Sequence, residues 1–205
     1  MRIFFEILKP IENTAILDVG GNIFNWALVK GKPKIAILNI KLPRNYGLEY
    51  KNNVKFVLGN GLNLPFRDNS FDIGYSNSVI EHLETLENQK EFAKEIMRVG
   101  KNIFVQTPNK YFFVEPHILT PFIHYLPKGV QRRLLRNFTI WGLVTRPSQQ
   151  YCINRVIDEI RLLSYKELRL LFPNCSIIKE KFLFFTKSFY IIRKIDKEDV
   201  YGNRD

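Results

Sequence analysis

Short apolar runs alternate with helical patterns along the first half of the chain, and each run has the length of one buried strand. The five runs are Ala15–Val19, Lys34–Ile40, Val54–Leu58, Phe71–Ser76 and Ile103–Gln106. Between the last two runs, Gln89–Val99 repeats apolar residues at spacings of four and three, which predicts the apolar face of a helix. Strands that alternate with helices predict a parallel sheet covered on both faces.

The C-terminal part of the chain follows a different pattern. Ser164–Phe172 predicts a helix that begins with a capping box, a serine followed three residues later by a glutamate. Two runs rich in β-forming residues follow, Ser176–Phe185 and Ser188–Ile195, with only Thr186 and Lys187 between them, which predicts an antiparallel hairpin. The predicted fold class is therefore α/β: a Rossmann-like, mostly parallel seven-stranded sheet flanked by helices, with a C-terminal antiparallel hairpin.

Residues 111–160 interrupt the alternation after the fifth strand. They are longer than a usual loop, and four prolines break them up: Pro116, Pro121, Pro127 and Pro147. We interpret this segment as an insertion that folds over the strand ends as a substrate lid. The 205 residues then form a single domain with a core of residues 14–110 and 161–195.

Polar residues and glycines follow the strands at the edge where open α/β sheets bind ligands, beyond the carboxyl ends. Among them are Asp18, Gly20, Gly21, Asn39, Asn60, Gly61, Ser76, Asn77, Gln106 and Asn109. Glycine permits a tight turn and a close backbone approach to a ligand, although glycines also simply end strands. One glycine turn is weak support for a ligand site, and several such stretches together are stronger.

Three stretches together resemble the class I S-adenosylmethionine-dependent methyltransferases, of the methyltransferase type 11 kind. They are ILDVGG (16–21), VLGNGLNLPFRDNSFDIGYSNSVIEHL (57–83) and FAKEIMRVGKNIFVQTPN (92–109). The middle stretch is the most specific, with L-P-F-x-D-x-S-F-D before a strand that closes in S-x-x-x-E-H. The resemblance covers residues 14–110, and VQTPNKYFFVEPH is also similar to a bacterial subgroup found among polysaccharide-biosynthesis genes.

The resemblance implies S-adenosyl-L-methionine as the cofactor, and it implies which residues bind it. The expected contacts, from the methionine end to the adenine, are Ser76, Asn77, Asp18, Gly20, Gly21, Asn39, Asn60, Gly61 and Leu62. In this arrangement Asn39 faces the ribose hydroxyls, and Asn60 lies near the exocyclic amine of the adenine. We expect no metal, because the chain has two cysteines without a CxxC pair and its acidic clusters lack metal-ligand spacing.

Three positions depart from the family's usual pattern. NIF follows Gly21 where D-x-G-x-G-x-G has its third glycine. Asn39 and Asn60 stand where the family usually has an acid, and an amide hydrogen-bonds a hydroxyl more weakly than a carboxylate. Two functions therefore stay open: methyl transfer, or a non-catalytic module that binds S-adenosylmethionine or S-adenosylhomocysteine. A nicotinamide oxidoreductase is disfavoured, because G-x-G-x-x-G is absent.

Histidines are the candidate acid–base residues, because an acceptor hydroxyl must lose a proton and an imidazole titrates near neutral pH. The chain has three, His82, His117 and His124. We take His82, after the fourth strand, and His117, in the insertion, as the catalytic candidates. The alternative is that each histidine holds a loop by hydrogen bonding. Glu81 is interpreted as an N-terminal residue of a helix.

Basic residues are distributed unevenly along the chain. The net charge is +11, and residues 120–169 alone carry nine basic and three acidic residues. Residues 122–146 hold five basic residues and no acid, interleaved with aromatic residues. This pattern fits peripheral contact with an anionic membrane, and it equally fits phosphate groups on a substrate, RNA or a solvated helix face. We expect an anionic small-molecule, sugar or lipid-linked acceptor, and we disfavour nucleic acid.

The remaining expectations concern location and core. No apolar run approaches the roughly 18 residues of a membrane span, and Glu6 precludes a signal-length apolar stretch at the start. We therefore expect a cytoplasmic protein, with any membrane contact peripheral. The aromatic stretches Tyr111–Phe113 and Phe182–Phe185 are interpreted as core.

Overall fold

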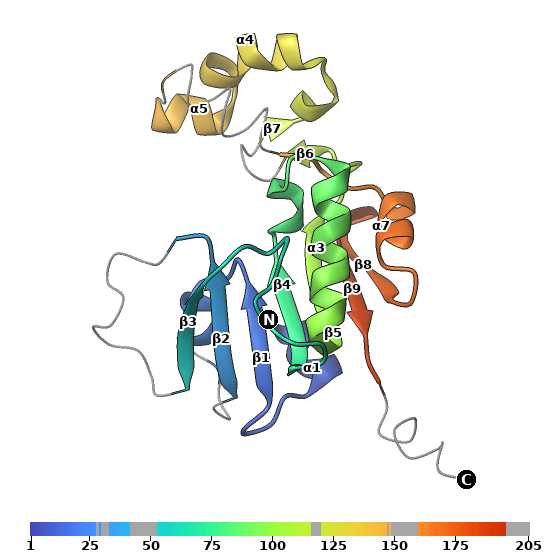
Figure 1. Ribbon diagram of the computed structural model, residues 1–205. Coiled ribbons are helices and arrows are strands. Elements are labelled where there is room, and N and C mark those ends of the chain that lie inside the picture. The colour runs from blue at the N-terminus through green and yellow to red at the C-terminus, as the bar shows by residue number, and fades with distance from the viewer. Residues whose placement is uncertain are drawn as a thin grey trace.

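The computed structural model describes residues 1–27, 29, 33–41, 53–115, 120–146, 148 and 160–195. Its centre is a seven-stranded sheet in the order β3-β2-β1-β4-β5-β9-β8 (Figure 1). The strands are β1 (Ala15–Val19), β2 (Lys34–Asn39), β3 (Val54–Leu58), β4 (Phe71–Asn77), β5 (Gly100–Pro108), β8 (Ser176–Phe182) and β9 (Phe185–Arg193). The first five pair in parallel, whereas β9 pairs antiparallel with both β5 and β8. The predicted fold class is confirmed.

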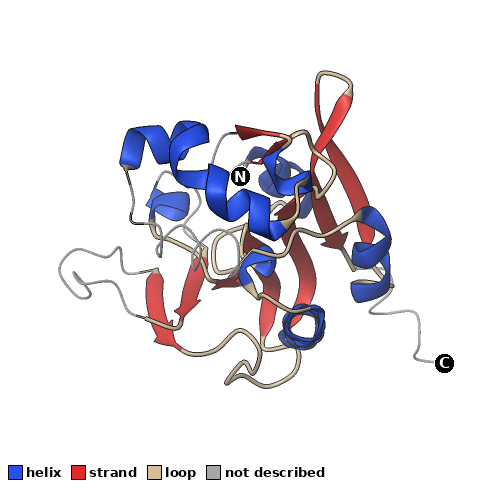
Figure 2. Ribbon diagram, turned by 90° about the horizontal axis from the view of Figure 1, so that it is seen from above, coloured by secondary structure: helices blue, strands red, loops and turns tan. Residues whose placement is uncertain are grey.

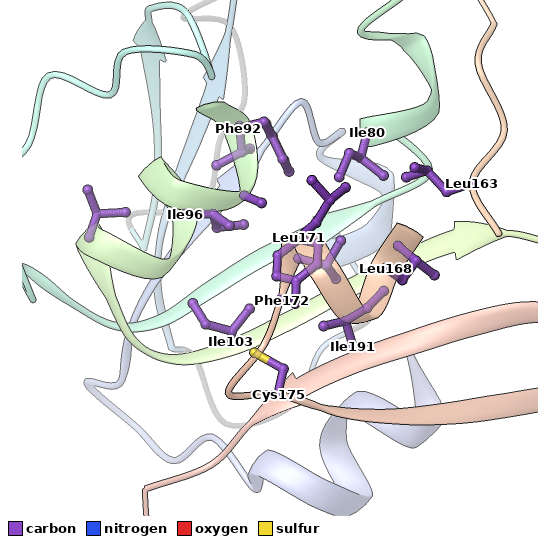
Figure 3. Packing of buried hydrophobic residues seen from close by; sticks show 14 of the residues in the cluster. Ile80, Phe92, Ile96, Ile103, Leu163, Leu168, Leu171, Phe172, Cys175 and Ile191 are labelled. Carbon is purple, nitrogen blue, oxygen red and sulfur yellow. The ribbon is translucent and has the colours of Figure 1, made fainter. Parts of the chain in front are cut away.

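One face of the sheet is covered by α3 (Leu86–Val99) and α7 (Tyr165–Leu171). Their apolar residues converge on side chains from the strands, as Figure 3 shows for Phe92 and Ile96 of α3 and Leu168 of α7 above Ile103 and Ile191. All five side chains are almost completely buried. Because helices cover the sheet on both faces, the strands read in the sequence as continuous apolar runs.

The other face is covered by α1 (Arg2–Leu8) and the short α2 (Phe24–Ala27), neither of which the sequence pattern predicted. Phe4 of α1 lies at the centre of an aromatic cluster. Its ring meets those of Trp26, Tyr75 and Phe104 edge to face, with centroids 6.0, 5.0 and 5.3 Å apart. Edge-to-face pairs add to the stabilisation from burial, so this cluster ties the N-terminal helix to β4 and β5.

Both predicted helices are present, and their caps explain where they begin. Thr85 accepts a hydrogen bond from the backbone N–H of Asn88 at 3.1 Å, so α3 starts three residues earlier than the periodicity alone predicted. In α7 the capping box is complete, because Ser164 accepts from the Glu167 backbone and Glu167 accepts from the Ser164 backbone.

The predicted position of the β8–β9 turn is wrong. The turn is formed by Leu183 and Phe184, whereas Thr186 and Lys187 lie within β9, where Thr186 pairs with Lys181 of β8. Leu183 has a φ of 54°, a left-handed conformation that leucine rarely adopts. The run of apolar residues continues through the turn, so no turn-forming residue type marked its position in the sequence.

The described part of the insertion after β5 lies above the carboxyl ends of the strands (Figure 1). Its elements are β6 (Val114–Glu115), β7 (Thr120–Pro121), η2 (Ile123–Tyr125), α4 (Lys128–Phe138) and α5 (Ile140–Thr145). A small apolar cluster of Ile123 and Leu135, with Leu134 and Trp141, holds η2 and the two helices together. Seen from above in Figure 2, the turn of the β8–β9 hairpin projects from the body of the molecule. None of the helices described is long and apolar enough to cross a membrane.

Candidate functional site

A buried carboxylate organises the turn after β1. Asp18 is fully buried, and its Oδ2 accepts a hydrogen bond from the Trp26 indole N–H at 2.7 Å. A Cβ at Gly21 would lie 1.8 Å from the same oxygen, so the backbone passes against the carboxylate. Gly20 has a φ of 75°, and a Cβ there would lie 2.7 Å from Val79. Glycine is therefore required at both positions.

Burial raises the pKa of Asp18 to about 7, and the hydrogen bond from Trp26 offsets part of that shift. Within the ranges that the structure describes, the second carboxylate oxygen, Oδ1, has no hydrogen-bond partner. A cationic or N–H donor group brought by a ligand would stabilise the ionised carboxylate. The carboxylate is thus a candidate partner for the amino group of an amino acid moiety.

The end of β2 is joined to this turn by Asn39. Its amide Nδ2 donates to the Gly21 carbonyl at 3.0 Å, while the Gly20 N–H donates to the Leu38 carbonyl at 2.8 Å. A carboxylate at position 39 could not make the first of these bonds, because it has no donor. The bond gives a physical reason for an asparagine at this position, and the amide oxygen remains the atom that could accept a ribose hydroxyl.

The turn after β3 is held by its own side chain and by close packing. The Oδ1 of the exposed Asn60 accepts from the Leu62 N–H at 2.9 Å. A Cβ at Gly61 would lie 3.1 Å from Val19 and 3.3 Å from Phe92, so this glycine allows the turn to sit against β1 and α3. Because a carbonyl oxygen has two lone pairs, Asn60 can still accept a second hydrogen bond, as its expected place beside the adenine requires.

The loop that follows is fixed from α3 by an ion pair. Arg98 donates to the carbonyls of Phe66 at 2.7 Å and Leu64 at 3.1 Å, and Glu95 accepts from the Leu64 N–H at 2.7 Å. The Arg98 guanidinium also binds Glu95 at 2.8 Å and holds the pKa of that carboxyl below its usual range. Sequence reasoning missed this pair, although it immobilises the L-P-F-x-D segment.

Ser76 and Asn77, the two predicted residues at the end of β4, differ sharply in exposure. The Ser76 hydroxyl is completely buried and donates to the Val19 carbonyl at 3.0 Å, so its side chain joins β4 to β1 and leaves only its backbone for a ligand. The Asn77 side chain is exposed. The next residue, Ser78, has a φ of 54°, and its hydroxyl donates to Gln106 of β5 at 2.8 Å.

Within the described residues, the candidate acid–base side chains do not come together at one place. His82 lies at the end of η1 (Ile80–His82), and its side chain is exposed. His117 falls outside the described residues. His124 is half-buried, with its ring centroid 4.1 Å from that of Tyr125. Glu81 lies in a helical turn, as predicted, but it is completely buried and accepts a hydrogen bond from Thr107 at 3.0 Å.

A buried polar network fixes η1 against α3 and α7. Gln89 donates to the carbonyls of Ile80 at 3.0 Å and Arg161 at 2.8 Å, and it accepts from the Arg161 guanidinium at 2.6 Å. The same guanidinium forms an ion pair with Glu167. One arginine of the basic stretch at 120–169 therefore stabilises the fold and does not face a partner.

Beside these turns lies a cavity of about 450 Å³, here called the aromatic cavity. It is lined by Ser78, Gln106, Pro108, Phe112, Phe113, Val114, Phe182, Lys187 and Ser188. Apolar walls with a few polar groups are typical of small-molecule sites. Ser78 links the cavity to the Asp18 turn, because its neighbour Val79 lies against Gly20.

The aromatic stretches are only partly core. Phe112 is buried, but Tyr111 and the four residues 182–185 are exposed, so their interpretation as core is wrong. The two strands end at the edge of the sheet, and this tip extends past the helices that cover the rest. Within the described ranges, no three His, Cys, Asp or Glu side chains come together as a metal-binding group.

Comparison with known proteins shows what the chain is similar to. Residues 35–102, a third of the chain, match the family model of a methyltransferase domain. No curated protein matches the chain. Solved structures do, among them an S-adenosylmethionine-dependent methyltransferase from Methanosarcina mazei, with 17% identity, a TM-score of 0.52, and coverage of 91% of this chain and 95% of the other.

Two further neighbours share the fold at low identity. An S-adenosylmethionine-dependent methyltransferase from Aquifex aeolicus has 14% identity and a TM-score of 0.53, over 93% of this chain and 88% of its own. The [4+2]-cyclase SpnF has 16% identity and a TM-score of 0.52, over 86% of this chain and 56% of its own. Likeness at this level shows the fold, and the last neighbour illustrates that one fold serves more than one reaction.

Proposed function

Since the family match and the fold support a class I S-adenosylmethionine-dependent methyltransferase with S-adenosyl-L-methionine as its cofactor, we propose that the chain methylates an acceptor bound in the aromatic cavity. The acceptor is a small molecule, a sugar or a lipid-linked group. The observation that carries the proposal is the position of Ser78 and Val79, which lie between the cavity and the Asp18 turn. A methyl donor in that turn and an acceptor in the cavity would be neighbours.

The residues of the turns fit the proposed cofactor. Asp18 offers a buried carboxylate with one oxygen that has no hydrogen-bond partner among the described residues, and Gly21 lets the backbone approach closely. Asn39 at the end of β2 and Asn60 after β3 offer amide oxygens to the ribose and the adenine. When bound, the cofactor supplies an electrophilic methyl group on a sulfonium.

The walls of the cavity serve the acceptor. Methyl transfer needs the nucleophile held in line with the methyl group, and a rigid apolar cavity provides position and excludes water. Phe112 and Phe113 give the lining apolar rings, and Lys187, whose ammonium lies 3.9 Å from Glu180, adds a positive charge that suits an anionic acceptor. His82 and His117 remain the proposed bases for an acceptor hydroxyl.

A second function, a non-catalytic module that binds the cofactor or its demethylated product, is favoured by one observation. Asn39 uses one of its two amide hydrogens within the protein, and neither it nor Asn60 provides the charge that a family acid would bring to the cofactor. Such a module predicts binding without turnover, and it predicts no effect of His82→Ala on any activity.

Titration calorimetry with S-adenosylmethionine and S-adenosylhomocysteine tests the first step. Heat at micromolar to millimolar ligand is expected, and no detectable heat at millimolar ligand would overturn both functions. Incubation with methyl-labelled S-adenosylmethionine and a panel of phosphorylated sugars and prenyl-linked sugars then separates the two. Label in an acceptor supports the enzyme, whereas binding with no labelled acceptor supports the module.

A pH titration tests the role of Asp18. The free site holds this carboxyl with a pKa of about 7, and only the ionised form attracts a cationic amino group. Affinity for S-adenosylhomocysteine should therefore rise between pH 6 and pH 8. In Asp18→Asn the same titration should be flat. A flat profile for the wild type would place the amino group elsewhere.

A further inference from the structure

The tip of the β8–β9 hairpin exposes a continuous apolar surface. Phe182, Leu183, Phe184 and Phe185 are 52%, 74%, 96% and 53% exposed. A turn normally carries polar residues, and an exposed apolar patch of this kind marks a contact with another molecule or a membrane. The rings of Phe182 and Phe185 contact Phe112 and Phe113 at their inner sides. Leu183 and Phe184, which are the most exposed of the four, contribute little to folding in water and are the side chains that suit an external partner.

The exposed tip is continuous with the insertion through ring contacts. The Phe185 ring lies 5.1 Å from that of Phe113, and Phe113 lies 6.2 Å from the exposed Phe122, which is itself 6.4 Å from the exposed Tyr125. We name the exposed members of this chain the apolar rim: Phe122, Tyr125, Phe182, Leu183, Phe184 and Phe185. Phe112, Phe113 and Phe182 also line the aromatic cavity, so the rim borders the opening of the proposed acceptor site.

The neighbouring helix α5 adds an exposed aliphatic face. Ile140, Leu143 and Val144 are 55%, 48% and 77% exposed, and their spacings of three and four residues place them on one side of the helix. Both features lie at the same edge of the sheet, because β8 runs parallel to β1–β5 and α5 lies above their carboxyl ends (Figure 1).

The charged residues near these apolar side chains indicate which kind of partner suits the surface. Arg133, Arg136 and Arg146 are exposed on α4 and at the end of α5, and Lys181 is exposed beside the hairpin tip. Residues 120–146 contain no acid. Basic side chains around exposed apolar ones match an anionic lipid surface, where headgroups meet the charges and acyl chains meet the apolar groups. The rings of the apolar rim could stack on RNA bases, but the aliphatic face of α5 offers no ring for stacking, so a lipid surface accounts for both features and RNA for only one.

We propose that the apolar rim and the α5 face dock the protein on an anionic lipid bilayer, with the aromatic cavity opening toward it. The docking stands independently of the proposed methyl transfer. If both the docking and the methyl transfer hold, the acceptor is lipid-linked, with its reactive group in the cavity and its lipid chain in the bilayer.

Vesicle co-sedimentation tests the proposal with the full chain. The wild type should bind vesicles of phosphatidylcholine with 30% phosphatidylserine, bind phosphatidylcholine alone much more weakly, and lose affinity as salt rises. Leu183→Ser with Phe184→Ser should reduce binding to the anionic vesicles at least tenfold. Arg133→Gln with Arg136→Gln should reduce it about thirtyfold, at roughly one kcal/mol per basic residue near such a surface.

The matched control removes the same charge elsewhere. Lys34→Gln with Lys55→Gln changes two exposed lysines of β2 and β3, and it should leave vesicle binding within about twofold. The proposal is overturned if the control variant loses as much vesicle binding as the arginine variant. It is also overturned if the wild type binds both vesicle types equally, or binds neither. Tip-dependent self-association in sedimentation velocity, or preferential binding to a single-stranded RNA, overturns it as well. Calorimetry with S-adenosylhomocysteine should give wild-type heat in the Leu183/Phe184 variant, which separates failure here from failure of the proposed function.

Discussion

The cofactor side and the acceptor side of this sheet edge are built in opposite ways. On the cofactor side, polar side chains bind the protein itself: Asp18 accepts from Trp26, Asn39 donates to Gly21 and Ser76 donates to Val19. On the acceptor side, apolar residues 182–185 face water. The contrast matches the two proposals, a preorganised site for one small ligand in the first region and a docking surface in the second. Substitutions should therefore change stability on the first side and only binding on the second.

The largest expected effect comes from Asp18. Its folded pKa of about 7 exceeds its ordinary value of 3.8, so the contribution of the neutral carboxyl to stability is full below pH 4 and is lost as pH rises through 7. This loss is up to about 4 kcal/mol. Asp18→Asn should remove this pH dependence of the free energy of unfolding. Denaturant unfolding of both proteins at pH 5 and pH 8 measures it. A variant with the wild-type pH dependence would show that this carboxylate is not desolvated.

The next effect is expected for Gly21→Ala, which places a methyl group against the Asp18 carboxylate. We expect a loss of about 3 kcal/mol in the free energy of unfolding, together with loss of cofactor affinity. Gly129→Ala is the matched control, because a Cβ there meets nothing within 4 Å and the position lies in α4. Gly129→Ala should raise the free energy of unfolding by up to about 1 kcal/mol. Thermal unfolding of both variants checks the contrast, and equal melting temperatures would contradict it.

Arg98→Ala should have a smaller effect, of about 2 kcal/mol, because hydrogen bonds to a charged group are lost and two loop carbonyls lose their donor. The loop at 64–68 should exchange its amide protons faster, while the hairpin at 176–193 should not change. Hydrogen exchange measures both segments in one experiment. Faster exchange in the hairpin as well would mean that the two sides are coupled.

The two asparagines give a finer test. Asn60→Asp keeps the oxygen that accepts from Leu62 and should leave cofactor affinity equal or better, and a tenfold loss would refute the adenine placement. Asn39→Asp loses its donor to the Gly21 carbonyl and should cost about 1 kcal/mol of stability. Calorimetry and thermal unfolding of the pair distinguish a position that needs an acceptor from one that needs a donor.

The smallest effect on stability is expected at the hairpin tip. Phe184→Ser alters a side chain that is 96% exposed, so the free energy of unfolding should stay within about 0.5 kcal/mol of the wild type. Urea unfolding checks this value. A loss above 1 kcal/mol would show that the tip packs within the chain and would weaken the contrast between the two sides.

The sequence predicted the strands and turns around Asp18 and Asn39 better than it predicted the hairpin tip. Buried parallel strands show as continuous apolar runs, and their order along the chain places Asp18 and Asn39 at neighbouring strand ends. The tip at 182–185 was assigned to strand and core, because hydrophobicity does not say which residues a neighbour covers. Leu183 turns the chain without glycine, proline or asparagine, so the turn was placed three residues too late.

Long-range polar contacts were also beyond the sequence. Gln89 and Arg161 lie 72 residues apart and meet only after α3 and α7 dock on the sheet. Neither residue has a local pattern that indicates burial. The catalytic candidates rest on residue type alone, and the exposed His82 and the undescribed His117 stay predictions.

The edge position of β8 has a consequence for the solubility of the chain. An outer strand offers unpaired backbone groups to a second copy, and here it ends in an exposed apolar tip, a combination that favours aggregation. Lys179 and Lys181 are exposed on this strand, and charges there oppose pairing between copies. We therefore expect the two lysines to oppose edge-to-edge pairing of β8 while leaving the tip available.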